Sequence, residues 1–298
     1  MLTVGAGSVQ VHECDAMGHM NVRFYVARAT DALASLGLTL GLGPRFARAQ
    51  HAYLAMAEAH IRFLGEMRPG TPFVFHGGVL QMDERPRLYL EMRDVATNRV
   101  AATFAIVAAL VDSQTAGWRA VPPLEGTIDT IGLPDHAAPR GVALGPPRSS
   151  PTWAEAEALG LVLGYEGMVT AAECNECGLM RSDGVIARVW DAVPNLSKRL
   201  EDAEDAMPPG GRAALEYRII HHATPRAGDV LAIRAGLRAV GAKTITPVNW
   251  LFDRETGEAV ATAESVIVGF DSQTRKAVEI SDAARQALER HIIPSLLV

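Results

Sequence analysis

The sequence predicts an α+β fold built from two copies of one domain in tandem. The first observation behind this prediction is an internal repeat: residues 13–32 align without gaps with residues 173–192 and share eight identities, where average composition gives about one or two. The second is a further match at nearly the same offset, between residues 94–115 and 253–274, which ends in Asp-Ser-Gln-Thr in both places. A repeat this long is too large for a solenoid unit, so each copy is expected to fold as a complete unit.

Each copy is expected to contain one long helix and four later strands. An extended segment comes first, over residues 3–12 and 161–172, and apolar residues then recur every three or four positions along one face of a helix. The stripe runs over residues 22–40 in the first copy and 185–200 in the second. Turn signals separate the β-rich runs that follow. These are residues 52–63, 72–81, 87–93 and 100–112, then 213–222, 229–239, 243–252 and 259–271. The order predicts an antiparallel sheet packed on one helix.

A stretch of different composition separates the copies. Residues 122–151 contain seven prolines and few large apolar residues, which is typical of a connection between domains. The predicted division is an N-terminal domain over residues 1–121, a Pro-rich linker over 122–151 and a C-terminal domain over 152–298. A short helix capped by Ser281 is expected over residues 281–291.

The composition is that of an ordinary globular protein. The chain has 298 residues, 48% of them hydrophobic and 21% charged, and a net charge of −6, which leaves room for two domains of about 150 residues each. No basic stripe indicates a nucleic-acid partner. The longest apolar run, residues 100–111, is too short to cross a bilayer and no secretory leader is evident, so we expect a cytoplasmic protein without a membrane partner.

The cysteines do not indicate a disulfide framework or a metal site. Their number is three, which is odd, and no secretory signal accompanies them. Cys174 and Cys177 have the spacing of a redox pair or half a zinc site, but neither a thioredoxin-like context nor further zinc ligands are evident. We therefore expect no metal and no redox cofactor.

Asp15 lies between the first extended segment and the long helix, close to Gly18, His19 and Asn21. Free N–H groups in a first helical turn stabilise negative charge, whether on a carboxylate or on an oxyanion that forms from a carbonyl. A carboxylate beside such a turn suits acyl transfer. The alternative is that Asp15 only caps the helix, and the residues alone favour that interpretation because aspartate is a preferred N-cap residue.

The string from Glu13 to Tyr25 resembles the Asp-x-x-Gly-His-x-Asn-x-x-x-Tyr signature of hotdog-fold acyl-CoA thioesterases of the 4-hydroxybenzoyl-CoA thioesterase type. The predicted order of elements fits as well, since a hotdog domain wraps an antiparallel sheet around one long helix. Hotdog domains work as dimers with acyl-CoA sites between subunits. A tandem chain would therefore resemble a covalent pseudo-dimer, a double hotdog.

The resemblance implies a role for each signature residue. The catalytic carboxylate falls on Asp15, as nucleophile or general base, and the amide that polarises the thioester carbonyl falls at about Val22. Gly18 would allow close backbone approach to the substrate. The substrate-binding positions fall on His19, Asn21 and Tyr25. Each of these three also has a structural interpretation, as a partner of loop backbone or as a core residue with a polar tip.

The second copy departs from the signature at the positions that carry chemistry. Asn175 replaces the aspartate and cannot act as a general base, while Leu179 and Arg181 replace the histidine and the asparagine. Glu176 is one residue away and could substitute if the loop were aimed differently. The sequence therefore predicts one competent site at Asp15 and a possible, altered second site at Asn175 and Glu176.

The function that follows is hydrolysis of an acyl-CoA-type thioester to a carboxylate and a free thiol. One alternative is a hotdog hydratase acting on enoyl thioesters, which needs an Asp/His pairing that is not evident. Another is a non-catalytic acyl-CoA-binding module or sensor, which the altered second copy supports and Asp15 disfavours. The expected partner is the thioester substrate, and exposed edge strands would permit a homo-oligomer of pseudo-dimers.

Overall fold

A computed structural model of the chain describes residues 1–298 apart from 125–127, 148, 201–210, 272, 295 and 297–298. The first copy of the repeat contains the following elements: β1 (Leu2–Ser8), α1 (Val22–Thr39), α2 (Pro44–Gln50), β2 (Ala52–Phe63), β3 (Pro72–Gln81), β4 (Arg87–Asp94), β5 (Val100–Asp112) and β6 (Trp118–Arg119). The second copy contains these: α3 (Trp153–Ala158), β7 (Val162–Met168), α4 (Asp183–Arg199), β8 (Gly211–His221), β9 (Val230–Val240), β10 (Thr244–Asp253), β11 (Ala259–Phe270) and α6 (Asp282–Glu289).

Every predicted long helix and strand is present, with ends that differ by a few residues. The two extended segments are shorter than expected because a 3-10 turn follows each strand, at Val11–Glu13 and at Ala171–Glu173. In the first turn the carboxylate of Glu13 accepts a hydrogen bond from the amide of Gln10 at 2.7 Å, which closes the backbone. The short elements α2, β6 and α3 are not predicted, because elements of two to seven residues are too short to display a periodic apolar face.

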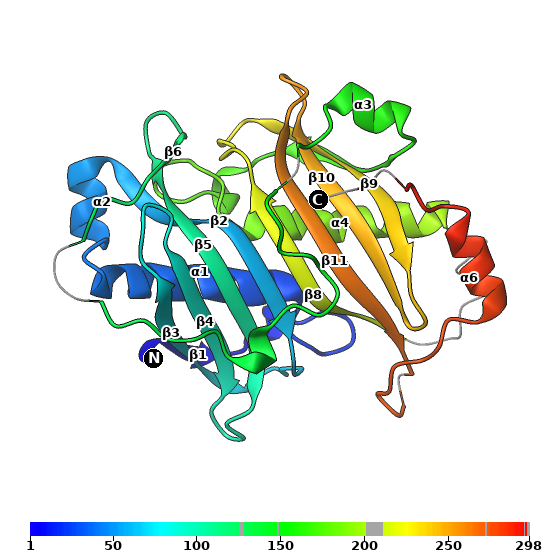
Figure 1. Cartoon of the computed structure of the whole chain (residues 1–298), viewed down its shortest axis with the longest axis horizontal. Helices are drawn as coiled ribbons and strands as arrows, with labels where there is room; N and C mark the ends of the chain where they lie inside the picture. The colour runs from blue at the N-terminus through cyan, green and yellow to red at the C-terminus, as the bar shows by residue number, and fades with distance from the viewer. Residues whose placement is uncertain (125–127, 148, 201–210, 272, 295, 297–298) are drawn as a thin grey trace.

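The described strands form one antiparallel 11-stranded sheet. Its order is β1-β3-β4-β5-β2-β8-β11-β10-β9-β7, and β6 pairs with β5. The two copies meet where β2 pairs with β8, and each long helix lies on the same face, behind the sheet in the view of Figure 1. This arrangement confirms the predicted α+β class and the tandem plan of one long helix and one sheet per copy.

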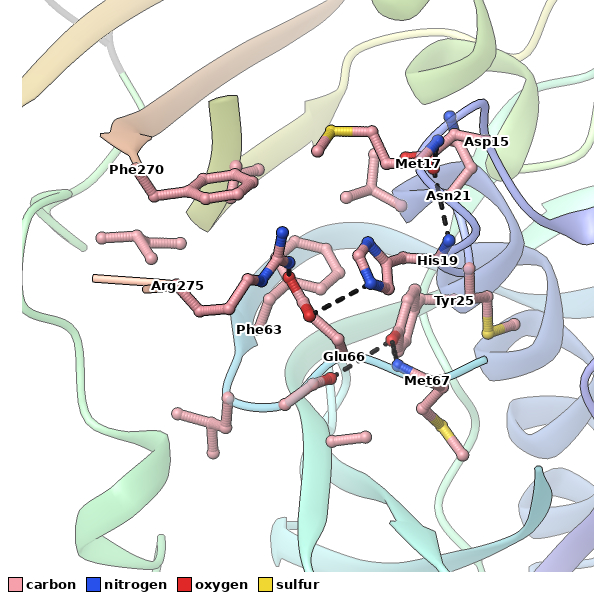
Figure 2. A pocket seen from close by; sticks show the side chains of 18 of the residues that line it. Asp15, Met17, His19, Asn21, Tyr25, Phe63, Glu66, Met67, Phe270 and Arg275 are labelled. Carbon is pink, nitrogen blue, oxygen red and sulfur yellow. Dashed lines mark hydrogen bonds and ion pairs between the residues drawn. The ribbon is translucent and has the colours of Figure 1, made fainter. Parts of the chain in front are cut away.

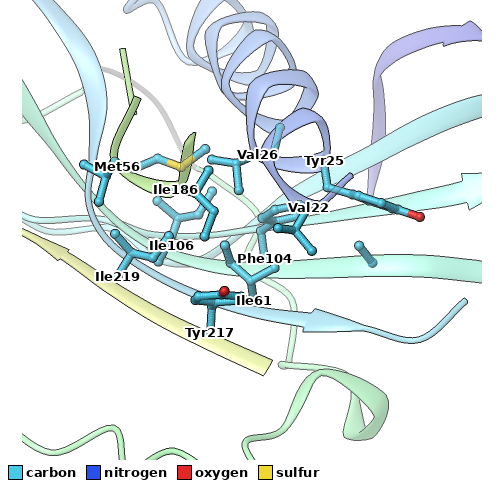
Figure 3. Close-up of a cluster of buried hydrophobic side chains, with 14 of the residues drawn as sticks. Val22, Tyr25, Val26, Met56, Ile61, Phe104, Ile106, Ile186, Tyr217 and Ile219 are labelled. Carbon is cyan, nitrogen blue, oxygen red and sulfur yellow. The ribbon is translucent and has the colours of Figure 1, made fainter. Parts of the chain in front are cut away.

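The apolar core lies between the helices and the sheet and runs through both copies. The stripe of α1 is buried along its length, and its members Val26 and Ala29 are at most 1% exposed. Figure 3 shows where the copies meet: Val22 and Val26 of α1 and Ile186 of α4 point toward Ile61 of β2 and Ile219 of β8. Fully burying one such side chain stabilises the fold by about 1.5–3 kcal/mol, so the copies fold on a shared core.

The opposite face of the β2–β8 pair carries buried polar groups. His60 Nε2 lies 2.6 Å from Glu216 Oε1, and Arg218 Nε donates to Glu58 Oε1 at 2.7 Å. In both pairs a strand of one copy contacts the neighbouring strand of the other. His60 and Arg218 are directly opposite each other in the register, at the centre of the pairing. Both pairs therefore join the copies on the side away from the helices.

Residues 134–145, which we call the strap, cross this polar face. In Figure 1 the strap is the green segment in front of the sheet. The amides of Arg140 and Gly141 donate to the carboxylate of Glu216 at 3.0 and 2.7 Å. Burial opposes ionisation of Glu216, but hydrogen bonds from His60 and from these two amides outweigh it and hold the pKa of Glu216 below its usual value.

The strap also accepts hydrogen bonds from two arginines of the junction. Arg218 donates to the carbonyls of Ala143 and Gly145, and Arg62 donates to those of His136 and Ala138. Much of the segment predicted as a linker is therefore packed against both copies, although residues 125–127 and 148 lie outside the described part. The division at residues 1–121, 122–151 and 152–298 stays a prediction. Within the described residues, none of the helices has the length and apolar character needed to span a membrane.

We predict that the junction under the strap carries much of the stability. Glu216→Ala removes the acceptor of buried His60 and of two strap amides, and should lower the free energy of unfolding by about 3–5 kcal/mol. As a control, Arg119→Ala breaks the more exposed pair that Arg119 makes with Asp112 at 3.3 Å, which should cost less than about 1 kcal/mol. Urea denaturation compares the two variants, and equal losses would contradict this account.

Candidate active site

Two cavities lie between the copies, and each is next to one copy of the repeated loop. The first cavity has a volume of about 680 Å³ and the second about 460 Å³. Five of the six predicted residues of the first copy line the first cavity, and Gly18 is the exception. The five are Asp15, His19, Asn21, Val22 and Tyr25. The second copy supplies much of the facing wall, including Trp190 of α4 and Phe270 of β11. The first cavity is therefore complete only when both copies are in place.

The Asp15 loop is closed by hydrogen bonds within its own residues. Asp15 Oδ1 accepts from the amides of Met17 and His19 at 2.9 and 3.3 Å, and the amide of Asp15 donates to the carbonyl of His19 at 2.9 Å. Gly18 has φ of 74°, in the left-handed region that favours glycine. The loop thus holds the Asp15 side chain through one oxygen, while the residue as a whole is exposed at the cavity.

Asn21, and not Asp15, caps helix α1. The side-chain oxygen of Asn21 accepts from the amide of Arg23 at 2.9 Å, and its carbonyl accepts from Phe24 at 2.9 Å. The interpretation of Asp15 as a helix cap is therefore wrong: Asp15 lies in a closed loop, seven residues before the helix begins at Val22. Asn21 accepts hydrogen bonds from the amides of Arg23 and Phe24. In this first turn the amide of Val22 is therefore the one that does not donate to the cap.

Tyr25 is a buried residue with a polar tip, 3% exposed. Its hydroxyl donates to the carbonyl of Gly65 at 3.3 Å and accepts from the amide of Met67 at 3.2 Å. Burial raises the pKa of Tyr25 far above its ordinary value, so the hydroxyl stays neutral. The ring lines the cavity while the hydroxyl fixes the segment that follows β2, and the predicted contact between Tyr25 and substrate stays a prediction.

His19 belongs to a cluster that links the copies at the first cavity. Figure 2 shows its ring next to Glu66, which also pairs with Arg275 of the second copy. His19 Nε2 lies 3.3 Å from Glu66 Oε2, and the Arg275 guanidinium lies 4.3 Å from the ring centre of Phe270. Partial burial, followed by the charges of Arg275 and Arg68, lowers the pKa of His19, so the ring is neutral at pH 7.

Glu66 and Arg275 were missed in the sequence. Glu66 follows β2 and Arg275 follows β11, so neither belongs to the repeated motif. A signal for Arg275 lay in the second repeat. Arg275 and Ala116 are equivalent positions, because each directly follows one copy of Asp-Ser-Gln-Thr. Both have a positive φ, of 58° for Arg275 and 62° for Ala116. The second copy therefore carries a charge at this position that the first copy lacks.

The repeated residues that are identical in both copies support the backbone. Arg28 Nη2 lies 2.8 Å from Glu13 Oε1, and Arg188 Nη1 lies 2.8 Å from Glu173 Oε1, so each copy contains the same ion pair. Gly178 has φ of 73°, like Gly18. These identities are therefore explained by the fold of the loop and helix and do not require a catalytic role in both copies.

The second cavity has the same loop and different chemistry. Asn175 Oδ1 accepts from the amides of Cys177 and Leu179 at 2.9 and 3.1 Å, as Asp15 does in the first copy. The amide of Met180 donates to the carbonyl of Pro225, as the amide of Met20 donates to that of Met67. Pro225 is therefore equivalent to Met67, and Thr224 is equivalent to Glu66. Asn175 and Glu176, the possible second site, both line this cavity.

Comparison with protein families gives a match over both copies. Residues 9–138 and 169–288 match the model of the Thioesterase-like superfamily. Among curated proteins, no match was found.

Solved structures share the fold along nearly the whole chain. A Lactobacillus plantarum protein described as an oleoyl thioesterase aligns with a TM-score of 0.66 and 10% identity, over 89% of this chain and 95% of that one. The 12:0-ACP thioesterase from Umbellularia californica aligns with a TM-score of 0.65 and 10% identity, over 89% and 93%. An acyl-ACP thioesterase from Bacteroides thetaiotaomicron gives 0.63 and 14%, over 88% and 96%. These likenesses confirm the tandem hotdog fold.

We predict that Tyr25→Phe destabilises the protein without unfolding it. The substitution leaves the Gly65 carbonyl and the Met67 amide without their buried partner, which should cost about 1–3 kcal/mol. Denaturant titration at pH 7 measures the loss. A variant within about 0.5 kcal/mol of the wild type would mean that the hydroxyl does not hold this segment.

We also predict that stability falls as the pH is lowered from 7 to 5, in part through His221. Burial, followed by the neighbouring His222, lowers the pKa of His221 to about 4. Between about pH 6.5 and 4 the unfolded chain therefore binds a proton that the folded chain does not, and acid favours unfolding. At pH 5 this group should cost about 2 kcal/mol relative to neutral pH.

The matched variant is His221→Phe, because Phe63 occupies the corresponding end of β2. Urea denaturation at pH 7 and pH 5 should show a smaller loss for this variant than for the wild type. Equal losses in both proteins would contradict the assignment to His221.

Proposed function

The chain belongs to the thioesterase-like superfamily, and from this membership we propose that it hydrolyses an acyl-CoA-type thioester to a carboxylate and a free thiol, with Asp15 as nucleophile or general base. One observation carries the proposal. Asp15, which is exposed, and Val22, at the start of α1, line the same cavity. The facing wall of this cavity is largely apolar and comes from the other copy. A carboxylate, a first-turn amide and an apolar chamber are the three parts that thioester hydrolysis needs.

As a general base, Asp15 takes a proton from water while the oxygen of that water attacks the thioester carbonyl. The carbonyl oxygen becomes an oxyanion, which the unused amide of Val22 and the dipole of α1 stabilise. Collapse of this intermediate breaks the carbon–sulfur bond, and the departing sulfur takes the proton from Asp15. As a nucleophile, the carboxylate attacks the carbonyl itself, and the carbon–sulfur bond breaks to release the thiolate, which takes a proton from solvent. Water then hydrolyses the resulting anhydride to the product carboxylate and regenerates Asp15.

The fixed loop supports either role. Both hydrogen bonds that the loop gives to the Asp15 side chain end on Oδ1, so the carboxylate is oriented before a substrate arrives. Orientation of this kind lowers the entropy cost of the reaction. Neutral His19 lies beside the same loop, where its ring is a polar contact for the substrate, and its contact with Glu66 holds it there.

The walls of the first cavity divide into two kinds of surface. Apolar side chains that suit an acyl chain include Met20, Phe63, Trp190, Val268 and Phe270. Arg99 and Arg212 also line it and are the cations we propose for the phosphates of a phosphopantetheine thiol carrier, while Arg275 is paired with Glu66. Such an arm occurs in coenzyme A and in acyl carrier protein, so the arginines support the thioester class and the assay must compare both carriers.

The decisive substitution is Asp15→Asn, which keeps the shape of the side chain and its accepting oxygen but removes the ionisable group. We predict that kcat for thioester hydrolysis falls by at least about 100-fold, because neither proton transfer nor carboxylate attack remains. Thiol release is measured over a panel of acyl-CoA and acyl carrier protein substrates.

Asn175→Asp is the matched control, since the second loop makes the same hydrogen bonds around residue 175. It should leave the rate within about twofold of the wild type. Full activity in Asp15→Asn, or loss of activity only in Glu176→Gln, would contradict the assignment of the active copy. Tight binding without hydrolysis of any substrate would favour the non-catalytic acyl-CoA-binding module.

A further inference from the structure

The second cavity is large enough to hold a ligand, but its groups differ from those of the first. Its volume of about 460 Å³ lies within the range of about 300–1,000 Å³ that is usual for small-molecule sites. Its apolar walls come from both copies and include Leu54, Met56 and Val111 of the first and Met180 of the second. The duplication has therefore kept a chamber next to each loop.

The charge of the second cavity disfavours an anionic ligand. Its lining contains one arginine, Arg181, together with the carboxylates of Asp31 and Glu176. Arg181 Nε lies 3.0 Å from Asp183 and its Nη2 lies 3.7 Å from Asp31, so this guanidinium is already paired. The phosphate of a thiol carrier or the carboxylate of a fatty acid would meet more carboxylates than arginines here, whereas in the first cavity three arginines balance the carboxylates of Asp15, Glu66 and Asp94.

Two polar atoms in the lining of the second cavity have no hydrogen-bond partner among the described residues. They are Trp118 Nε1 and Thr224 Oγ1, and both atoms are buried. An indole N–H can only donate, and a buried donor without an acceptor costs about 1–3 kcal/mol. Trp118 is also specific to this cavity, because its counterpart in the first is Ala277. The wall of the cavity therefore contains two donors without a partner, in an apolar setting.

The remaining polar groups around the cavity are neutral. Burial raises the pKa of Tyr53 to about 12, and a hydrogen bond with Asn175 opposes that effect only in part. His221, which replaces Phe63, is neutral at pH 7 because burial lowers its pKa to about 4. Asn175 cannot supply a general base. A ligand held here would contact hydrogen-bonding groups and apolar walls, without the oriented carboxylate of the first cavity.

We propose that the second cavity is a non-catalytic binding site for an uncharged, largely apolar molecule that bears a carbonyl-type hydrogen-bond acceptor. The acceptor bonds to Trp118 Nε1 or Thr224 Oγ1 after the side chain turns toward the cavity, and the hydrocarbon part packs on the apolar walls. This site is separate from the first cavity, and its occupation does not depend on thioester hydrolysis.

The test uses 2-nonanone as the probe and the full chain in isothermal titration calorimetry. The expected result is one ketone site per chain that persists when the first cavity is occupied by S-nonyl-coenzyme A, a thioether that cannot be hydrolysed. Nonanoate, the anionic counterpart, should bind at least about tenfold more weakly, which corresponds to 1.4 kcal/mol.

Two kinds of variant locate the ketone. Trp118→Phe with Thr224→Val removes both donors and keeps the shape, and should weaken ketone binding about 3–30-fold. Ala34→Trp adds a large side chain to the lining of the cavity from an exposed position of α1 and should abolish binding. Trp190→Phe removes the indole N–H of the first cavity, which has no partner in the described part of the chain, and should leave ketone affinity unchanged.

The proposal is overturned if no ketone binds once the thioether is present, if nonanoate binds as tightly as the ketone, or if Ala34→Trp has no effect. Because the Ala34 and Trp118 variants locate the ketone by themselves, the result stands even if the first cavity does not hydrolyse thioesters. Trp118→Phe should also retain the wild-type rate of thioester hydrolysis, which separates loss of the second site from loss of the fold.

Discussion

The pairing of β2 with β8 is the constraint on which the rest of the structure depends. It turns two sheets into one, places both long helices on the same face and brings the wall of each copy next to the loop of the other. The pairing is held on one side by a shared apolar core and on the other by His60–Glu216 and Arg218–Glu58 under the strap. Buried polar pairs are costly unless every member has a partner, and here the strap supplies backbone partners to Glu216 and Arg218. Without this junction neither cavity would have its facing wall.

The two copies keep one backbone and have separated in chemistry. Asn175 accepts the same two loop amides that Asp15 accepts, so replacing the carboxylate with an amide leaves the loop closed and removes only the ionisable group. Around it, Glu66 corresponds to Thr224 and Arg275 to Ala116, so the second cavity has lost the charged cluster as well as the carboxylate. The identical Glu–Arg ion pairs explain why the copies remain recognisable. Within the repeated motif, the residues that are identical hold the common backbone, and the residues that differ give the two cavities different chemistry.

Much of the fold could be predicted because the same order of helix and strands can be read from both copies of the repeat. The stripe of α1 and the ends of β2 and β3 follow from local periodicity, which the sequence displays directly. The path of the strap could not be predicted, since its contacts are made by backbone groups with junction residues such as Arg62 and Arg218, and composition carries no such information. The alternative of Asp15 as the helix cap is wrong although aspartate is a preferred cap residue, because asparagine is an equally good one and only the hydrogen bonds of the loop and of Asn21 decide between them. Glu66 and Arg275 were missed because they meet across the two copies.

The most direct measurement is a crystal structure of the Asp15→Asn variant with a bound medium-chain acyl-CoA. The thioester carbonyl carbon should lie about 3–3.5 Å from the side chain of residue 15, with its oxygen toward the amide of Val22. The acyl chain should lie against Trp190 and Phe270 of the other copy. A thioester bound beside Asn175 in the second cavity, or one held by the first copy without contact to the second, would contradict the proposed mechanism.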